Sequence, residues 1–264
     1  MNLVGLLEKT GCKNRMNPEI KKAAELLKQS KHAIVLTGAG ISVESGIPPF
    51  RGEGGLWNQY DPIVLDLKYF LKHPDISWPA IKKLFYDPYG QAKPNEAHYA
   101  LARLEQSGFI KTIITQNIDN LHQEAGSQNV YEFHGSLQTL LCLECRTEYS
   151  HIEVNFNETI PRCPKDNGLL KPNVVLFGEG ILKNIAIQSF TEAMKADVVL
   201  VIGTSGEVMP ACAIPYEAQK KGATIIEINP NQSDYTHSIT DVFLNGKATE
   251  MMTALERFIM ESKL

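Results

Sequence analysis

Four groups of residues in this 264-residue chain have types and spacings that could do chemistry. Gly38 and Gly40 follow an apolar run and, having no Cβ, could let the backbone approach a phosphate. The polar stretch 116–119 follows another apolar run. His134 stands beside a glycine and could exchange a proton near neutral pH. Three cysteines and an aspartate between residues 142 and 166 could hold a metal ion.

The glycine turn differs from the usual dinucleotide-binding pattern. The pattern G-x-G-x-x-G requires a third glycine where this chain has Val43, and no second strand ends in an acidic residue at the expected distance. A loop with prolines, Phe50 and Arg51 follows instead. The turn therefore indicates phosphate binding in a less common setting.

The cysteines predict a structural metal site. The pair Cys142 and Cys145 and the pair Cys163 and Asp166 each have two residues between their members. The two pairs are separated by 17 residues, a spacing typical of zinc sites. An odd count of five cysteines argues against a disulfide framework, and Cys12 and Cys212 are interpreted as plain small residues. His151 as the fourth ligand and a site that has lost its metal both remain open. The expected ligands are Cys142, Cys145, Cys163 and Asp166.

The elements that must position these groups alternate along the chain. Asn17-Pro18 is a typical helix start, and helices are expected at 18–30, 95–107, 184–195 and 210–221. Apolar runs predict buried parallel strands at 33–37, 110–115, 130–133, 197–202 and 224–228. This alternation predicts an α/β fold with a Rossmann-like, doubly wound parallel sheet. Segments 53–93 and 137–172 break it and predict a smaller inserted domain, part helical and part zinc-ribbon-like.

Apart from the cysteine cluster, the residues that could do chemistry follow predicted strands. Ligands of open parallel sheets bind at the carboxyl ends of the strands, where Gly38–Gly40, Gln116–Asp119, His134, Gly203–Ser205 and Asn229 are expected. One crevice is therefore predicted there, with the smaller domain as its other wall. His98, in the helix expected at 95–107, and His122 are interpreted as packing or hydrogen-bonding residues.

Composition excludes several classes of protein. The chain is 43% hydrophobic and 21% charged, with a net charge of -4 and scattered basic residues. This argues against nucleic acid or an anionic membrane as the main partner. No apolar run approaches the about 20 residues that span a bilayer, and Leu3–Leu7 is too short for a signal-peptide core. A cytoplasmic location is expected.

Several motifs occur together and in order. Gly38–Gly52, Thr115–His122, Phe133–Gly135, the cysteine insert, Val174–Glu179 and Gly203–Ser205 together resemble the sirtuins of bacterial or archaeal type, the NAD-consuming protein-lysine deacylases. The resemblance extends from about Pro18 to the last helix. It implies one catalytic unit, with a Rossmann-like part at 17–44, 94–136 and 173–264 and a small domain from 45–93 and 137–172.

The resemblance also implies roles for particular residues. His134 is expected to be the catalytic base, with Asn117 and Asp119 in the nicotinamide pocket, and zinc is expected on the cysteine cluster with Asp166 replacing a fourth cysteine. Peptide substrate is expected against Val175, Phe177, Gly178, Glu179 and Val208. The remaining NAD contacts are expected from Gly38, Ala39, Gly40, Ser42, Phe50, Arg51, Trp57, Gln116, Ile118, Gly203, Thr204, Ser205, Asn229 and Ala248.

The implied reaction transfers an acyl group from a protein lysine to ADP-ribose, releasing nicotinamide and free lysine. Mono-ADP-ribosylation of protein and NAD hydrolysis are the alternatives, since both would use the same pocket without a ribose-hydroxyl base. In succinyl-removing sirtuins a tyrosine–arginine pair selects the acyl group. Ile81 and Leu84 are expected at those positions here, and such an apolar wall would favour acetyl or longer neutral groups.

Overall fold

The computed structural model describes residues 17–50 and 54–261, so Cys12 and Arg51 lie outside the described residues. Its centre is a six-stranded parallel sheet in the order β3-β2-β1-β7-β8-β9. Every residue of β1 and β7 is buried, as expected for strands covered on both faces. The strands are β1 (Ala33–Thr37), β2 (Thr112–Thr115), β3 (Val130–Glu132), β7 (Val198–Ile202), β8 (Thr224–Asn229) and β9 (Val242–Asn245).

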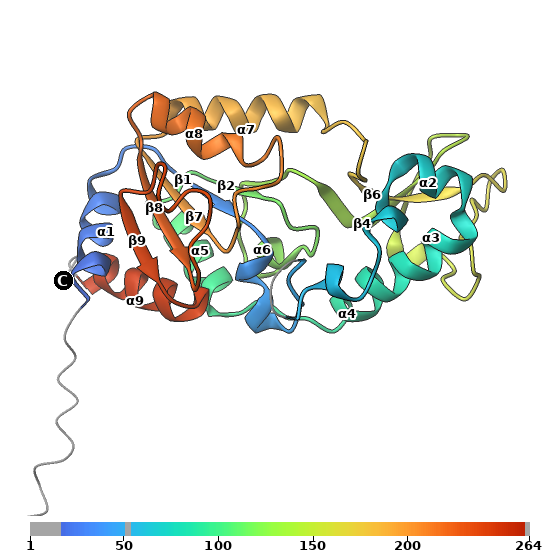
Figure 1. Ribbon diagram of the computed structural model, residues 1–264, viewed down its shortest axis with the longest axis horizontal. Helices are drawn as coiled ribbons and strands as arrows, with labels where there is room; N and C mark the ends of the chain where they lie inside the picture. The colour runs from blue at the N-terminus through green and yellow to red at the C-terminus, as the bar shows by residue number, and fades with distance from the viewer. Residues whose placement is uncertain (1–16, 51–53, 262–264) are drawn as a thin grey trace, which may run out of the picture.

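Helices cover both faces of this sheet and bury two separate hydrophobic cores. One layer contains α1 (Pro18–Gln29), α5 (Glu96–Gln106) and α9 (Ala248–Glu261), of which α9 contacts both of the others. The other contains α7 (Lys183–Lys195) and α8 (Ala213–Lys220), which lie along the opposite face in Figure 1. The predicted doubly wound α/β sheet is confirmed.

The two inserted segments share a third hydrophobic core. One of them forms helices, in which Trp78 is buried, and a π-helical turn, Lys82–Tyr86, in which Phe85 is buried. The other forms a three-stranded antiparallel sheet in the order β5-β4-β6. These elements lie together beyond one end of the large sheet (Figure 1). They are α2 (Leu67–Lys72), α3 (Pro74–Ile81), α4 (Asp87–Tyr89), β4 (Gly135–Cys142), β5 (Glu148–Ser150) and β6 (Leu170–Val174).

Most predicted elements occur within a few residues of their expected bounds. Asn17 caps α1 as predicted, with its Oδ1 accepting from the Glu19 N–H at 3.0 Å. Strand β9 was not predicted, because three apolar residues and an asparagine between Asp241 and Gly246 are too short a run to show periodicity. A short helix, α6 (Leu121–Glu124), also follows the polar stretch after β2. Within the described part of the chain, no helix is both long enough and apolar enough to cross a membrane.

Candidate active site

A crevice of about 980 Å³ opens at the carboxyl ends of the parallel strands. It lies where the strand-end turns were expected to converge, and residues of the inserted segments form part of its wall. The predicted site residues that line it are Gly38, Ala39, Gly40, Phe50, Trp57, Gln116, Asn117, Ile118, His134, Val175, Phe177, Gly178, Glu179, Gly203, Thr204, Ser205, Val208, Asn229 and Ala248.

The glycine turn after β1 packs directly on the turn after β7. A Cβ on Gly40 would lie 2.6 Å from the Cα of Gly203, and one on Gly38 would lie 2.8 Å from the Gly203 carbonyl oxygen. Gly203 itself has a φ of +62°, which favours glycine. These glycines therefore bring two strand ends into backbone contact at the floor of the crevice, in addition to offering space for a phosphate.

Ser42 and Asp119 do not line the crevice but lie in the layer behind it. Ser42 Oγ donates to Asp119 Oδ2 at 2.7 Å, and the Leu121 N–H donates to the other carboxylate oxygen at 3.1 Å. Burial raises the pKa of Asp119, and the hydrogen bond from Ser42 opposes that shift. Asn117 links this layer to the floor, since its Nδ2 donates to the Gly38 carbonyl at 3.1 Å and to Ser42 Oγ at 3.2 Å.

His134 lies in the turn between β3 and β4 and lines the crevice. Its Nδ1 is 3.0 Å from the Gln116 carbonyl oxygen. Because a carbonyl only accepts hydrogen bonds, Nδ1 carries the proton and Nε2 keeps its lone pair. Burial lowers the pKa of His134, and the hydrogen bond to the Gln116 carbonyl opposes that shift. The ring is therefore a neutral base poised beside the crevice.

His98 and His122 form a buried pair beneath the glycine turn, with ring centroids 4.9 Å apart. His122 Nε2 lies 2.9 Å from Thr37 Oγ1, and the Asn95 N–H donates to His98 Nδ1 at 3.3 Å. Burial lowers the pKa of His98 to about 4 and that of His122 well below its usual range. Both are neutral core residues, as interpreted from the sequence.

Polar side chains fix the far rim of the crevice. Gln116 Nε2 donates to Thr204 Oγ1 at 3.0 Å, and Asn229 Nδ2 donates to the Thr204 carbonyl at 2.9 Å. The ends of β2, β7 and β8 are thereby tied together through one threonine. On the opposite side, the rings of Phe50 and Trp57 lie 5.4 Å apart, and those of Trp57 and Phe177 lie 6.1 Å apart.

The prediction for the acyl-selecting wall was wrong. Ile81 and Leu84 are buried in the core of the inserted segments, and neither lines the large crevice. The helical insert turns Phe85 to the crevice instead, which alignment by sequence alone could not resolve. Val174, Leu176, Glu207 and Met209 also line the crevice, within the segments Val174–Glu179 and Gly206–Met209 that the resemblance assigns to the peptide side. Crevice residues that sequence reasoning missed are Val43, Glu44, Pro49, Phe85, Gly180, Ile181, Pro210, Pro230, Asn231, Gln232 and Lys247. Several are immediate neighbours of predicted residues.

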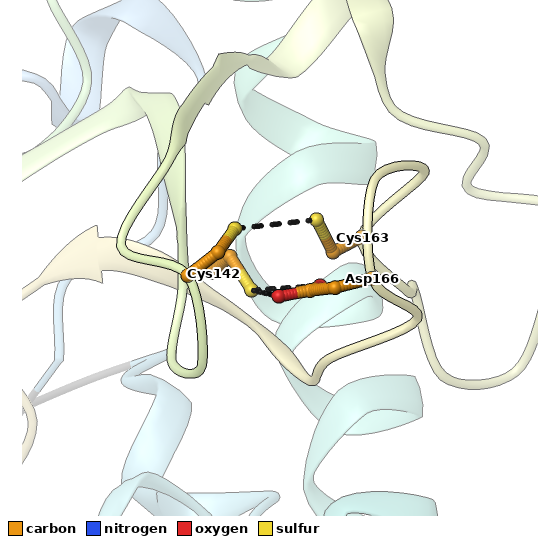
Figure 2. A group of neighbouring side chains, drawn as sticks. Cys142, Cys163 and Asp166 are labelled. Carbon is orange, nitrogen blue, oxygen red and sulfur yellow. Dashed lines mark hydrogen bonds between the residues drawn. The ribbon is translucent and has the colours of Figure 1, made fainter.

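The cysteine cluster is assembled as predicted. One ligand atom from each of Cys142, Cys145, Cys163 and Asp166 lies within 4.8 Å of all the others. Figure 2 shows Cys142 on one side, and Cys163 and Asp166 from a single loop on the other, pointing toward one another. His151 is not part of the cluster, since its Nδ1 lies 3.2 Å from the Gln138 carbonyl oxygen.

The donor set and spacing fit zinc. Two sulfurs bound to one tetrahedral zinc at about 2.3 Å lie about 3.8 Å apart, and the Sγ atoms of Cys145 and Cys163 are 3.8 Å apart. Asp166 Oδ1 lies 3.4 Å from Cys142 Sγ. Hydrogen bonds from Cys163 and the Gly168 N–H hold the pKa of Asp166 below its usual range, so it is ionised as a ligand must be.

The fold and crevice together define an α/β protein built to bind a nucleotide at strand ends beside a neutral histidine. The model of the Sir2 family matches residues 38–210. The NAD-dependent protein deacylase 2 of Archaeoglobus fulgidus is 47% identical over 248 residues, covering 90% of this chain and 94% of that protein. This chain belongs to the Sir2 family, the sirtuins.

Solved structures agree. A Sir2 homologue in complex with NAD has a TM-score of 0.86 and 40% identity, covering 94% of this chain and 95% of that one. A Sir2 protein with a deacetylated p53 peptide and 3'-O-acetyl ADP-ribose has a TM-score of 0.86 and 34% identity, covering 92% and 98%.

Proposed function

We propose that this chain removes acyl groups, acetyl among them, from protein lysines and transfers them to the ADP-ribose part of NAD. The products are free lysine, nicotinamide and O-acyl-ADP-ribose. The observation that carries the proposal is His134, whose neutral Nε2 borders a dinucleotide-sized crevice floored by the glycine turn. The relatives of this chain support the proposal, since they include a protein deacylase and complexes with NAD and with an acetyl-ADP-ribose.

In this proposal each wall of the crevice has one task. NAD supplies the acceptor sugar and loses nicotinamide in the reaction. The backbone around Gly38 and Gly40 accommodates the phosphates, while Thr204 and Asn229 face the adenosine end. Asn117, held by the buried Ser42–Asp119 layer, faces the nicotinamide end. His134 removes a proton from a ribose hydroxyl at Nε2, because Nδ1 is already committed to the Gln116 carbonyl.

The peptide side is proposed to be the segment after β6. Its Phe177 is 45% exposed and its Val175 borders His134, whose carbonyl accepts from the Val175 N–H at 2.8 Å. A peptide adding as a strand here would be recognised through its main chain. The zinc cluster is proposed to be structural, because its residues do not line the crevice.

We further propose the domain boundaries given by the resemblance, with the third hydrophobic core as the smaller domain. A cytoplasmic location is also proposed. It is supported by the free thiols of Cys142, Cys145, Cys163 and Cys212, since oxidising compartments favour disulfides. Cell fractionation checks the location, and recovery in a membrane or secreted fraction would contradict it.

The experiment that tests the function is mass spectrometry of a reaction with NAD and an acetyl-lysine peptide. We expect acetyl-ADP-ribose, nicotinamide and deacetylated peptide in equal amounts. Nicotinamide release without any acyl-lysine would instead favour NAD hydrolysis. ADP-ribose attached to protein would favour mono-ADP-ribosylation.

The pH profile of the reaction tests the state of His134. Its pKa lies below the ordinary value of 6.5 because the ring is buried. The neutral ring is the active form, so kcat/KM for the peptide is expected to hold as the pH falls to 6.5 and to decline only below it. kcat/KM between pH 5 and 8 measures this. An acid limb with its midpoint above 6.5 would contradict the assignment.

A further inference from the structure

Lys171, on β6, is a buried cation that the proposed chemistry does not use. Only 5% of the residue is exposed. Its Nζ donates to the carbonyl oxygens of Pro172 at 3.0 Å and Val174 at 2.7 Å, and to Glu179 Oε2 at 3.0 Å. A lysine ammonium has three N–H donors, so all three are matched. Burial lowers the pKa of Lys171, and the Glu179 carboxylate opposes that shift.

The three acceptors all belong to residues 172–179, and their hydrogen bonds to the ammonium bring the two ends of this stretch together. Glu179 Oε2 also accepts from the Leu176 N–H at 3.0 Å, and the Glu179 N–H donates to the Leu176 carbonyl at 2.9 Å. The segment 174–179 is therefore closed by its own main chain and by the Lys171–Glu179 pair. We call this segment the edge segment.

The edge segment is joined to the rest of the site on both sides. The Val175 N–H donates to the His134 carbonyl at 2.8 Å. Phe177 exchanges hydrogen bonds with the helical insert, donating to the Leu65 carbonyl at 2.9 Å and accepting from the Leu67 N–H at 2.9 Å. The ammonium thus anchors the point where the base, the helical insert and the crevice wall meet.

Burying a charge here has a cost that an apolar residue would avoid, and buried ion pairs are often replaceable by apolar residues without loss of stability. A role in geometry is the better explanation, because two of the three acceptors of Nζ, the Val174 carbonyl and the Glu179 carboxylate, belong to residues that line the crevice. We propose that Lys171 is a positioning residue that, through Glu179, holds the edge segment in the conformation against which an acyl-lysine peptide binds. The inference rests on the function proposed above.

The test compares Lys171→Met, which keeps the length of the stem and removes the ammonium, with Glu179→Gln, which weakens the other half of the pair and is only partly buried. The double variant completes the cycle, and Lys183→Met, at an exposed position of α7, is the matched control. Three quantities are measured: the Kd of an acetyl-lysine peptide by fluorescence anisotropy, the Kd of NAD, and hydrogen exchange of the Leu176 amide.

We expect Lys171→Met to raise the peptide Kd about tenfold, because the peptide must then order an edge segment that the ammonium no longer holds, while the Kd of NAD changes less than about twofold. The Leu176 amide should exchange faster, because its acceptor Glu179 is released. The double variant should be no weaker than Lys171→Met alone, since the two residues act as one pair. Lys183→Met should match the wild type.

A lower melting temperature with an unchanged peptide Kd would overturn the inference and leave Lys171 a purely structural residue. Should Lys171→Met fail to fold, an unchanged peptide Kd in Glu179→Gln would overturn it equally. None of these readouts needs turnover. A wild-type protein that binds the peptide but forms no acetyl-ADP-ribose would therefore refute the proposed function alone, whereas normal turnover with unaffected variants would refute the inference alone.

Discussion

Replacing His134 with alanine is expected to lower the rate of acyl-ADP-ribose formation by about 10²–10⁴-fold, the usual contribution of a general base. The side chain borders the crevice, its Nδ1 lies beside the Gln116 carbonyl and its ring contacts that of Phe133, so its removal leaves the glycine turn and the Asn117 layer in place. The Kd of NAD should therefore change little. Steady-state product formation and NAD titration measure the two effects separately.

The prediction has a matched control within the chain. His151 also places its Nδ1 beside a main-chain carbonyl, that of Gln138, at 3.2 Å, but it does not line the crevice. His151→Ala should keep the wild-type rate within about twofold. Nicotinamide release in the presence of acyl peptide, which needs no base, should survive His134→Ala better than acyl transfer does. Equal loss in both variants would assign the defect to the fold of the small sheet.

The sequence predicted the parts of the site that lie at strand ends and left out those formed through space. The turns at Gly38, Gln116, His134 and Gly203 follow apolar runs, so their convergence follows from the topology of a parallel sheet. Nothing local reveals that Ser42 Oγ reaches Asp119, 77 positions away, or that Gly203 packs on Gly40. Such contacts depend on the packing of whole elements.

The helical insert and Lys171 illustrate two further limits. In the insert, hydrophobic residues occur on several sides of a chain that passes into a π-helical turn, so the sequence does not say which one faces the crevice. Phe85 does, whereas Ile81 and Leu84 are buried. No local sequence signal marks Lys171, because only the fold places two carbonyls and a carboxylate around its Nζ.

The zinc cluster should affect the crevice although it does not touch it. Cys142 ends β4, the strand that begins next to His134, and Cys163 and Asp166 precede β6, which leads into Val174 at the crevice wall. Both strands belong to the core that contains Cys142 and Cys163. A metal that joins the end of β4 to the segment before β6 fixes one end of this small sheet, and through the paired strands it also restrains the histidine and the peptide side at the other end.

Removal of the metal is accordingly expected to cost both stability and activity. Elemental analysis should find one zinc per chain, and a strong chelator should lower the melting temperature by roughly 4–8 °C for a loss of about 2 kcal/mol. Cys163→Ser should bind no zinc and reproduce the effect, because three remaining donors leave the tetrahedral site incomplete. Cys212→Ser, outside the cluster, should keep the full metal content.

The variant Asp166→Cys distinguishes a site that binds zinc weakly from a site that no longer binds zinc. Thiolate is a stronger zinc ligand than carboxylate in this setting, so the variant should retain its single zinc at chelator concentrations that strip the wild type. A wild-type protein with no zinc, whose melting temperature and rate are indifferent to both chelator and Cys163→Ser, would mean that packing around Cys142 and Cys163 suffices. In that case the hydrogen bonds from Cys142 to Asp166 and between Tyr149 and Cys163, rather than a metal, hold the small sheet against the base.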